Sequence, residues 1–251
     1  MEKIYFNNPA GEVLSGIIEQ PYLAAKVPIV VMAHGFGSKK NNKTNLSLTE
    51  RFLEKGVGTF RFDFSGHGES EGKIEELTVT KGIGELKAAM EKIEHLEWVN
   101  RTRLGFLGGS FGGNVELLYV ARFGGVKALA LKSPISNYKE VRELQLGSDR
   151  IQQWARNGSI ELSGGIRSDF HFYEDASRID TYAEARNVRC PVFIVQGDHD
   201  EDIPMSHARA LESALGTVHM EVIQGADHGY TNPEHFARMI GLLERFLLES
   251  L

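Results

Sequence analysis

The residues Gly108 to Gly112 read G-G-S-F-G and contain the spacing G-x-S-x-G around Ser110. An apolar run precedes this stretch and a helical pattern follows it, so we expect a tight turn between a strand and a helix. In such a turn the serine takes a strained conformation with positive φ, and side chains at Gly108 and Gly112 would collide. The turn would hold the hydroxyl above the sheet edge, at a helix N-terminus that favours developing negative charge. We therefore predict that Ser110 is a nucleophile.

A serine nucleophile needs a base, because its hydroxyl is almost never ionised at neutral pH. We expect His228 in this role, since it follows the β-like run Val218–Ile223 and so lies at the carboxyl edge of the sheet, like Ser110. His34 is expected to order its own loop by hydrogen bonding the backbone. Structural or surface roles suit the histidines in helical, strand or irregular stretches, namely His95, His171, His207, His219 and His235.

The base in turn needs a carboxylate, which holds its tautomer and stabilises the imidazolium that forms. Three aspartates follow the β-like run Val192–Gln196: Asp198, Asp200 and Asp202. Asp198 could instead shape the turn, and Asp202 could cap the next helix. Spacing alone leaves the choice among them open.

The oxyanion formed by attack on a carbonyl needs two N–H donors. One donor is expected from the residue after the nucleophile, Phe111. The other is expected from the loop that follows the first parallel strand, where Gly35 permits a bend of the backbone and Phe36 supplies the N–H.

The elements that must position these residues alternate along the chain. Short β-rich runs, several of them apolar on both faces, are separated by helical patterns, which predicts a mostly parallel sheet covered by helices, with the first strands as an antiparallel edge. The β-like runs are Val13–Glu19, Ile29–Ala33, Gly58–Asp63, Arg103–Leu107, Val126–Leu131, Val192–Gln196 and Val218–Ile223. The helical runs are about Leu46–Lys55, Val79–Leu96, Gly113–Arg122, Met205–Leu215 and Pro233–Leu248.

One stretch, 135–187, carries no strong strand run and many aromatic residues. More than fifty residues without a sheet strand predict a cap inserted into a single domain that spans 1–251; the alternative is an ordinary crossover with extra helices. Below, 135–187 is called the insertion.

Composition narrows the class of protein. The 251 residues carry a net charge of −6, with 41% hydrophobic and 25% charged residues, which is typical of a globular protein without attraction for nucleic acid or anionic membranes. The N-terminus does not resemble a secretory signal, no run is long enough to span a bilayer, and the single Cys190 cannot form an internal disulfide. We expect a cytoplasmic protein without a metal or organic cofactor, acting on a small-molecule ester. Nucleic acid and membrane are not expected as partners, and a homodimer is left open.

Four motifs in this order resemble the α/β-hydrolase superfamily over essentially the full length. They are the segment 34–37 (H-G-F-G), the turn around Ser110, the acid loop G-x-x-D-x-x-I-P at 197–204, and the loop of His228. The resemblance implies an α/β-hydrolase fold with a mostly parallel eight-stranded sheet and a small cap. It also selects Asp200 as the catalytic acid. The segment 63–70 is similar to a loop that orders the site in this superfamily, so His67 is given no chemical role.

Within the superfamily, the length and position of the insertion resemble bacterial cinnamoyl or feruloyl esterases. That resemblance implies hydrolysis of hydroxycinnamoyl esters, with the insertion holding the aromatic acyl group. Gln145 and Tyr173 are then candidates to hydrogen-bond a phenolic hydroxyl, and Trp154 is a further candidate contact.

The chemistry that these residues predict is acyl transfer through an acyl-enzyme, as in a serine carboxylesterase. The same three side chains would serve a thioesterase, a monoacylglycerol lipase, an aminopeptidase or a C–C bond hydrolase. A non-catalytic binding protein that kept the fold is the third class of hypothesis.

Overall fold

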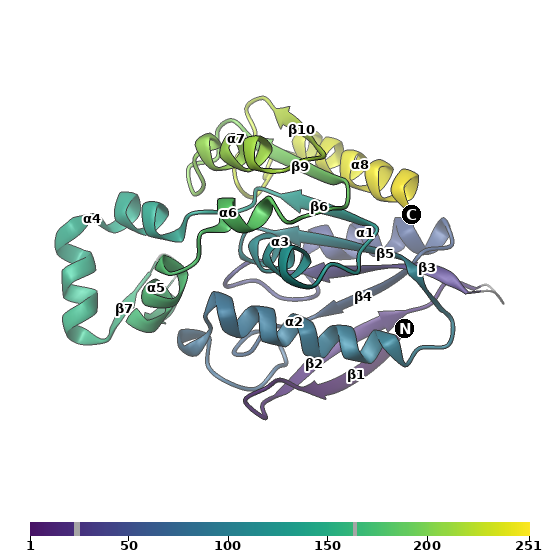
Figure 1. The fold of residues 1–251 in the computed structure, drawn as a ribbon, viewed down its shortest axis with the longest axis horizontal. Helices are drawn as coiled ribbons and strands as arrows, with labels where there is room; N and C mark the ends of the chain where they lie inside the picture. The colour runs from purple at the N-terminus through teal and green to yellow at the C-terminus, as the bar shows by residue number, and fades with distance from the viewer. Residues whose placement is uncertain (23–25, 163–164) are drawn as a thin grey trace.

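The computed structural model describes residues 1–22, 26–162 and 165–251 (Figure 1). Within these residues, eight strands form one sheet in the order β1-β2-β4-β3-β5-β6-β9-β10. The strands from β4 across to β10 pair in parallel, whereas β1 and β2 form an antiparallel edge. The bounds are β1 Glu2–Asn7, β2 Val13–Glu19, β3 Val27–Ala33, β4 Gly58–Phe62, β5 Val99–Gly109, β6 Ala128–Lys132, β9 Val192–Gly197 and β10 Val218–Ile223.

Helices cover both faces of this sheet. Figure 1 shows α2 and α3 in front of the strands, where α7 also packs; α1 and α8 share the apolar cluster of the opposite face. The predicted fold, a mostly parallel eight-stranded sheet flanked by helices, is confirmed. The helix bounds are α1 Lys43–Glu54, α2 Val79–Glu94, α3 Phe111–Phe123, α7 Met205–Ala214 and α8 Pro233–Ser250, with a 3₁₀ turn at Ile74–Glu76.

The insertion stands beside the sheet, where Figure 1 shows α4 and α5 at the left of the molecule. It consists of α4 (Tyr138–Asn157), a hairpin of β7 (Ser159–Glu161) and β8 (Arg167–Asp169), then α5 (Phe170–Ser177) and α6 (Thr181–Ala185). Gly147, with φ 72° and ψ 165°, breaks α4 into two helical halves. Residues 163 and 164 of the insertion lie outside the described residues.

Strand register brings the predicted loops to one edge. Ala33 at the end of β3 pairs with Gly108, Gly109 pairs with Lys132 at the end of β6, and Gly197 pairs with Ile223. Because parallel strands run in the same direction, the loops after β3, β5, β6, β9 and β10 all leave from their carboxyl ends. Residues far apart in the sequence therefore meet there.

The sequence prediction missed β1 and placed some helix starts late. In β1, Phe6 faces the core while its neighbours are exposed, so the strand shows only a weak apolar pattern. Helix α1 starts at Lys43 because the Asn42 side chain accepts a hydrogen bond from the Asn45 N–H. In the described part of the chain, no helix is both long and apolar enough to cross a membrane.

Candidate active site

Ser110 occupies the turn between β5 and α3 in a strained conformation, with φ 51° and ψ −116°. Such a positive φ is uncommon for a residue other than glycine. A Cβ on Gly108 would lie 2.6 Å from the backbone nitrogen of Gly113, and one on Gly112 would collide with the backbone of Ala33. The steric reason given for the two flanking glycines is thus confirmed, and the turn leaves Ser110 half-buried at the cavity described below.

Asp200 and His228 are joined by a hydrogen bond of 2.8 Å between Oδ2 of the carboxylate and Nδ1 of the imidazole. Oδ2 also accepts from the Gln196 side chain at 2.8 Å, while Oδ1 accepts from the backbone N–H groups of Ile203 at 2.8 Å and Asp202 at 3.1 Å. Burial opposes ionisation of the carboxyl, but the hydrogen bond and charge of His228 and these other donors outweigh it and lower the pKa of Asp200. The buried carboxylate thereby stays ionised and fixes the ring of His228.

The two other aspartates of this loop have different surroundings. Asp198 accepts a hydrogen bond from the Gly225 N–H at 2.6 Å and so holds the turn before His228. Asp202 is exposed at the cavity and does not cap α7, whose N-cap is Pro204. The structure thus pairs His228 with the aspartate that the superfamily resemblance selected.

Ser110 and His228 line the same cavity of about 450 Å³ and also a second cavity of about 440 Å³. Among the described residues, no hydrogen bond joins their side chains. In unliganded enzymes a bond between nucleophile and base is often long and tightens only with substrate bound. The fold therefore brings the three predicted side chains to one place, with the acid and base already joined.

The two predicted oxyanion donors flank Ser110. Phe111 opens α3, and the first bond of that helix runs from the Asn114 N–H to the Ser110 carbonyl at 3.1 Å, which leaves the Phe111 N–H available. The loop after β3 passes close to Ser110, since a Cβ on Gly35 would lie 3.4 Å from Cβ of Ser110. Next to it, the Phe36 ring packs on the Phe111 ring at 6.0 Å between centroids.

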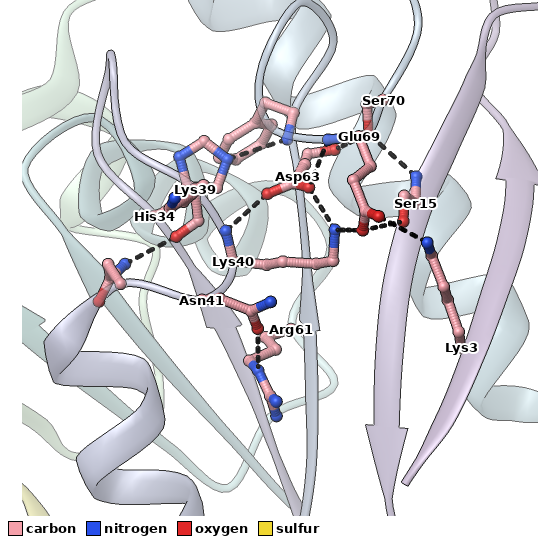
Figure 2. A network of polar contacts seen from close by, with 12 residues as sticks. Lys3, Ser15, His34, Lys39, Lys40, Asn41, Arg61, Asp63, Glu69 and Ser70 are labelled. Atoms are coloured by element: carbon pink, nitrogen blue, oxygen red, sulfur yellow. Dashed lines mark hydrogen bonds and ion pairs between the residues drawn. The ribbon is translucent and has the colours of Figure 1, made fainter.

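Two histidines order the loop after β3. Nε2 of His34 accepts a hydrogen bond from the Phe64 N–H at 3.0 Å, and Figure 2 shows this ring beside Asp63 and Lys40. Nε2 of His67 accepts a hydrogen bond from the Gly37 N–H at 2.9 Å. Burial lowers the pKa of His34 to about 4 and also lowers the pKa of His67. Both rings are therefore neutral acceptors at pH 7. The expectation that His34 hydrogen-bonds backbone is confirmed.

A network of ion pairs around the buried Lys40 and Asp63 supports the same loop. Lys40 is 2% exposed, its N–H donates to Asp63 at 2.6 Å, and its ammonium pairs with Asp63 and, at 2.7 Å, with Glu69 (Figure 2). The hydrogen bonds from Lys3 and Lys40 lower the pKa of Glu69 to about 2. This network anchors the segment that leads from the Phe36 loop to α1.

Lys132, at the end of β6, holds the loop of His228. Its ammonium donates to the backbone carbonyl of His228 at 2.7 Å and lies 5.0 Å from the centroid of the Tyr230 ring. Burial lowers the pKa of Lys132 to about 8. Lys132 was not among the predicted site residues. Its position opposite Gly109, one residue before Ser110, could have indicated that it lies near the site.

The larger part of the cavity wall comes from the insertion. Of the three predicted substrate contacts, only Gln145 lines the cavity. Trp154 is instead fully buried in the core of the insertion, where its indole N–H donates to the Ser168 carbonyl at 2.9 Å. Tyr173 donates its hydroxyl to Glu143 at 3.0 Å and is also absent from the described lining. Some aromatic residues of the insertion therefore stabilise the insertion itself, and only others line the cavity.

Two cavity residues were missed by the sequence analysis, Tyr138 and Arg142. They lie on the same face of α4 as Val141, Gln145 and Leu146, at helical spacing, and all five line the cavity. That spacing was the signal that could have found them. No group of three potential metal ligands occurs within the ranges that the structure describes.

The topology, the strained serine turn and the acid–base pair at the carboxyl edge define an α/β-hydrolase. Residues 47–251 match the sequence model of the prolyl oligopeptidase family, and the chain belongs to that family.

Known relatives and a solved structure are similar to most of the chain. The uncharacterized protein YfhR of Salmonella typhi is 26% identical, over 85% of this chain and 80% of YfhR. The mitochondrial palmitoyl-protein thioesterase ABHD10 of Mus musculus is 24% identical, over 80% of this chain and 68% of the relative. The structure of Est1E from Butyrivibrio proteoclasticus, solved with bound ferulic acid, superimposes with a TM-score of 0.87 at 25% identity and covers 98% of each chain. The chain is accordingly a hydrolase similar to esterases and thioesterases.

Proposed function

We propose that the protein is a serine carboxylesterase in which Ser110 is the nucleophile, His228 the base and Asp200 the orienting acid. The observation that carries the proposal is the 2.8 Å bond between Asp200 and His228 at a cavity that Ser110 also lines. A bond to Oδ2 of Asp200 keeps the proton of neutral His228 on Nδ1, so Nε2 is free to accept the serine proton.

The reaction follows from this arrangement. The Ser110 hydroxyl attacks the ester carbonyl as Nε2 of His228 takes its proton, and the N–H groups of Phe36 and Phe111 hold the oxyanion. The C–O bond then breaks, His228 protonates the leaving alcohol, and an acyl-serine remains. Water adds to the acyl-serine with the same base, which releases the acid and restores the hydroxyl.

Labelling with a fluorophosphonate tests the nucleophile directly. We expect the native protein to be labelled on Ser110 and S110A to be unlabelled. S133A is the matched control, because Ser133 also has a positive φ of 44° but does not line the cavity. Equal labelling of native protein and S110A would overturn the assignment of Ser110.

For the acyl group we propose an aromatic ring of the cinnamoyl or feruloyl kind in preference to an aliphatic chain. Four aromatic rings line the cavity, those of Phe36, Phe111, Tyr138 and Phe172, and Est1E was solved with ferulic acid. Rates for methyl ferulate should exceed those for methyl esters of aliphatic acids of similar size. Rates that depend only on chain length would refute this preference while leaving esterase activity intact.

Thioester hydrolysis is a second candidate, favoured by the similarity to the palmitoyl-protein thioesterase ABHD10. An acyl-serine forms equally from an ester or a thioester, so the triad does not discriminate between them. Matched oxygen and sulfur esters of one acyl group separate the two. Faster turnover of the sulfur ester, beyond the difference in intrinsic reactivity, would favour the thioesterase.

A further inference from the structure

Two residues in the wall of the 450 Å³ cavity, Tyr138 and Arg142, each carry a polar group without a hydrogen-bond partner within the described residues. The Tyr138 hydroxyl and Nε of Arg142 are both shielded from solvent, and neither makes a hydrogen bond there. Buried polar groups are normally hydrogen-bonded, because leaving one unpaired costs about 1–3 kcal/mol. Two such groups, four residues apart on α4 and bordering one cavity, call for a functional explanation.

Arg142 also lacks a carboxylate partner in the part of the chain that is described. Its Nη1 donates to the Gln145 side-chain oxygen at 2.7 Å, and its Cζ lies 5.7 Å from the centroid of the Phe172 ring. Burial lowers the pKa of Arg142 from its usual value, yet a guanidinium remains charged at neutral pH. The cavity therefore contains a half-buried positive charge that the Asp202 carboxylate stabilises only from a distance, without an ion pair among the described residues, and the cost of burial outweighs this attraction.

The two donors lie beyond the rings that border the nucleophile. Phe111, the residue after Ser110, packs on Tyr138 at 6.4 Å between centroids, and Phe172 packs edge-on against Tyr138 at 5.2 Å. Phe172 is also the ring that lies beside the Arg142 guanidinium. An acyl group bound to Ser110 would therefore cross an apolar, aromatic stretch before its far end met the two donors.

None of the other charged residues of the described cavity wall forms an ion pair with Arg142. Arg150 is exposed, and its one hydrogen bond among the described residues is a long one, 3.4 Å, to the Glu161 carbonyl. Asp202 and Glu161 are exposed as well; Asp202 attracts Arg142 through its charge but makes no hydrogen bond to it among the described residues. Arg142 is the cation that is set inside the cavity.

We propose that Arg142 and the Tyr138 hydroxyl bind a carboxylate at the far end of the acyl group, so that the enzyme prefers half-esters of dicarboxylic acids. This inference rests on the proposed function, because it assigns the acyl group of the same reaction. A guanidinium supplies charged donors in a planar fork that matches a carboxylate, and the phenol adds a further O–H donor. The proposal makes Arg142 and Tyr138 determinants of substrate specificity.

Methyl cinnamates that differ only at the para position test the proposal. The three substrates carry hydrogen, hydroxyl or carboxylate there, on one rigid acyl group. We expect kcat/KM to be about tenfold or more higher for the carboxylate than for the other two. In R142M this advantage should disappear while turnover of the para-hydrogen ester persists, and in Y138F it should shrink.

Arg156→Met is the matched control, because Arg156 is exposed on the outer half of α4 and does not line the cavity. It removes the same net charge from the same helix and should leave the order of the three substrates unchanged. An R142M protein that kept the preference, or a native enzyme that preferred hydroxyl or hydrogen to carboxylate, would overturn the proposal. The esterase assignment would survive that result.

Protection from a fluorophosphonate separates this inference from the proposed function. Adipate, with two carboxylates, should slow labelling of native Ser110 more than hexanoate does, and this difference should vanish in R142M. Equal protection by both acids would refute the carboxylate site even if the true substrate is a thioester. No labelling of native protein would instead refute the serine mechanism on which the inference rests.

Discussion

Replacing Asp200 by asparagine isolates the contribution of the acid. Asparagine has the same shape as aspartate, and backbone N–H groups fix the orientation of its amide. The oxygen that accepts from the N–H groups of Ile203 and Asp202 must remain an oxygen, since an amide nitrogen facing two N–H donors would lose both bonds. The asparagine NH₂ group is thereby directed at Nδ1 of His228.

The neutral imidazole then accepts at Nδ1 and carries its proton on Nε2, the nitrogen that faces the cavity. This is the wrong tautomer to take the Ser110 proton, and the anion that stabilises the imidazolium is gone as well. Loss of the equivalent interaction in serine proteases costs roughly 10⁴-fold in kcat. That corresponds to about 5.5 kcal/mol of transition-state stabilisation.

The assay is kcat and KM for one activated ester with wild type, D200N and D198N. Asp198 is the matched control, because it bonds the Gly225 N–H in the same loop but does not contact His228. We expect D200N to lose about 10³–10⁴-fold in kcat with little change in KM, and D198N to lose less than about tenfold. If D200N kept activity within about tenfold of wild type, or if D198N fell further than D200N, the assignment of Asp200 would be refuted.

Three further predictions follow from buried titratable groups. The pKa of His34 is lowered from 6.5 to about 4, so as pH falls the unfolded chain binds this proton before the folded protein does. About 3 kcal/mol of folding stability should therefore be lost between pH 6.5 and pH 4. H34N should flatten this part of the Tm–pH curve, and an unchanged slope would refute the role of His34. Burial raises the pKa of Glu116 well above its usual value, so this carboxyl lowers the stability of the fold as pH rises above about 4.5. The Tm of E116Q should match that of wild type near pH 4 and exceed it at pH 8. Identical Tm–pH curves for the two proteins would refute this destabilisation. K132M removes the bond to the His228 carbonyl and should lower kcat about tenfold with KM nearly unchanged, so a change confined to KM would show that Lys132 acts on substrate instead.

The sequence predicted the sheet and the residues at its edge because these depend on short-range patterns. Apolar runs marked the parallel strands, and the glycines around Ser110 reflected backbone contacts that have little tolerance for a Cβ. His228 followed from its position after the last strand. The choice of Asp200, in contrast, needed the family resemblance, because three aspartates at two-residue spacing follow the same strand and only the folded loop decides which one meets His228.

The cavity could not be predicted in the same way. Trp154 and Tyr173 were expected to contact substrate because they are aromatic, but they pack in the insertion or pair with Glu143. Arg142 borders the cavity because it lies on the face of α4 that also carries Tyr138 and Gln145. That orientation depends on how the insertion packs on the sheet, which periodicity does not encode.

The contact between Gly112 and the backbone of Ala33 joins two parts of the site that are far apart in the sequence. Ala33 is the last residue of β3, and the Phe36 loop follows it. The turn that holds the Ser110 hydroxyl and the loop that holds the Phe36 N–H are therefore in contact through main-chain atoms. Side-chain substitutions in the helices over the cavity leave this joint untouched. The wall that α4 contributes to the cavity can therefore vary in sequence without disturbing the main-chain contact that positions Ser110.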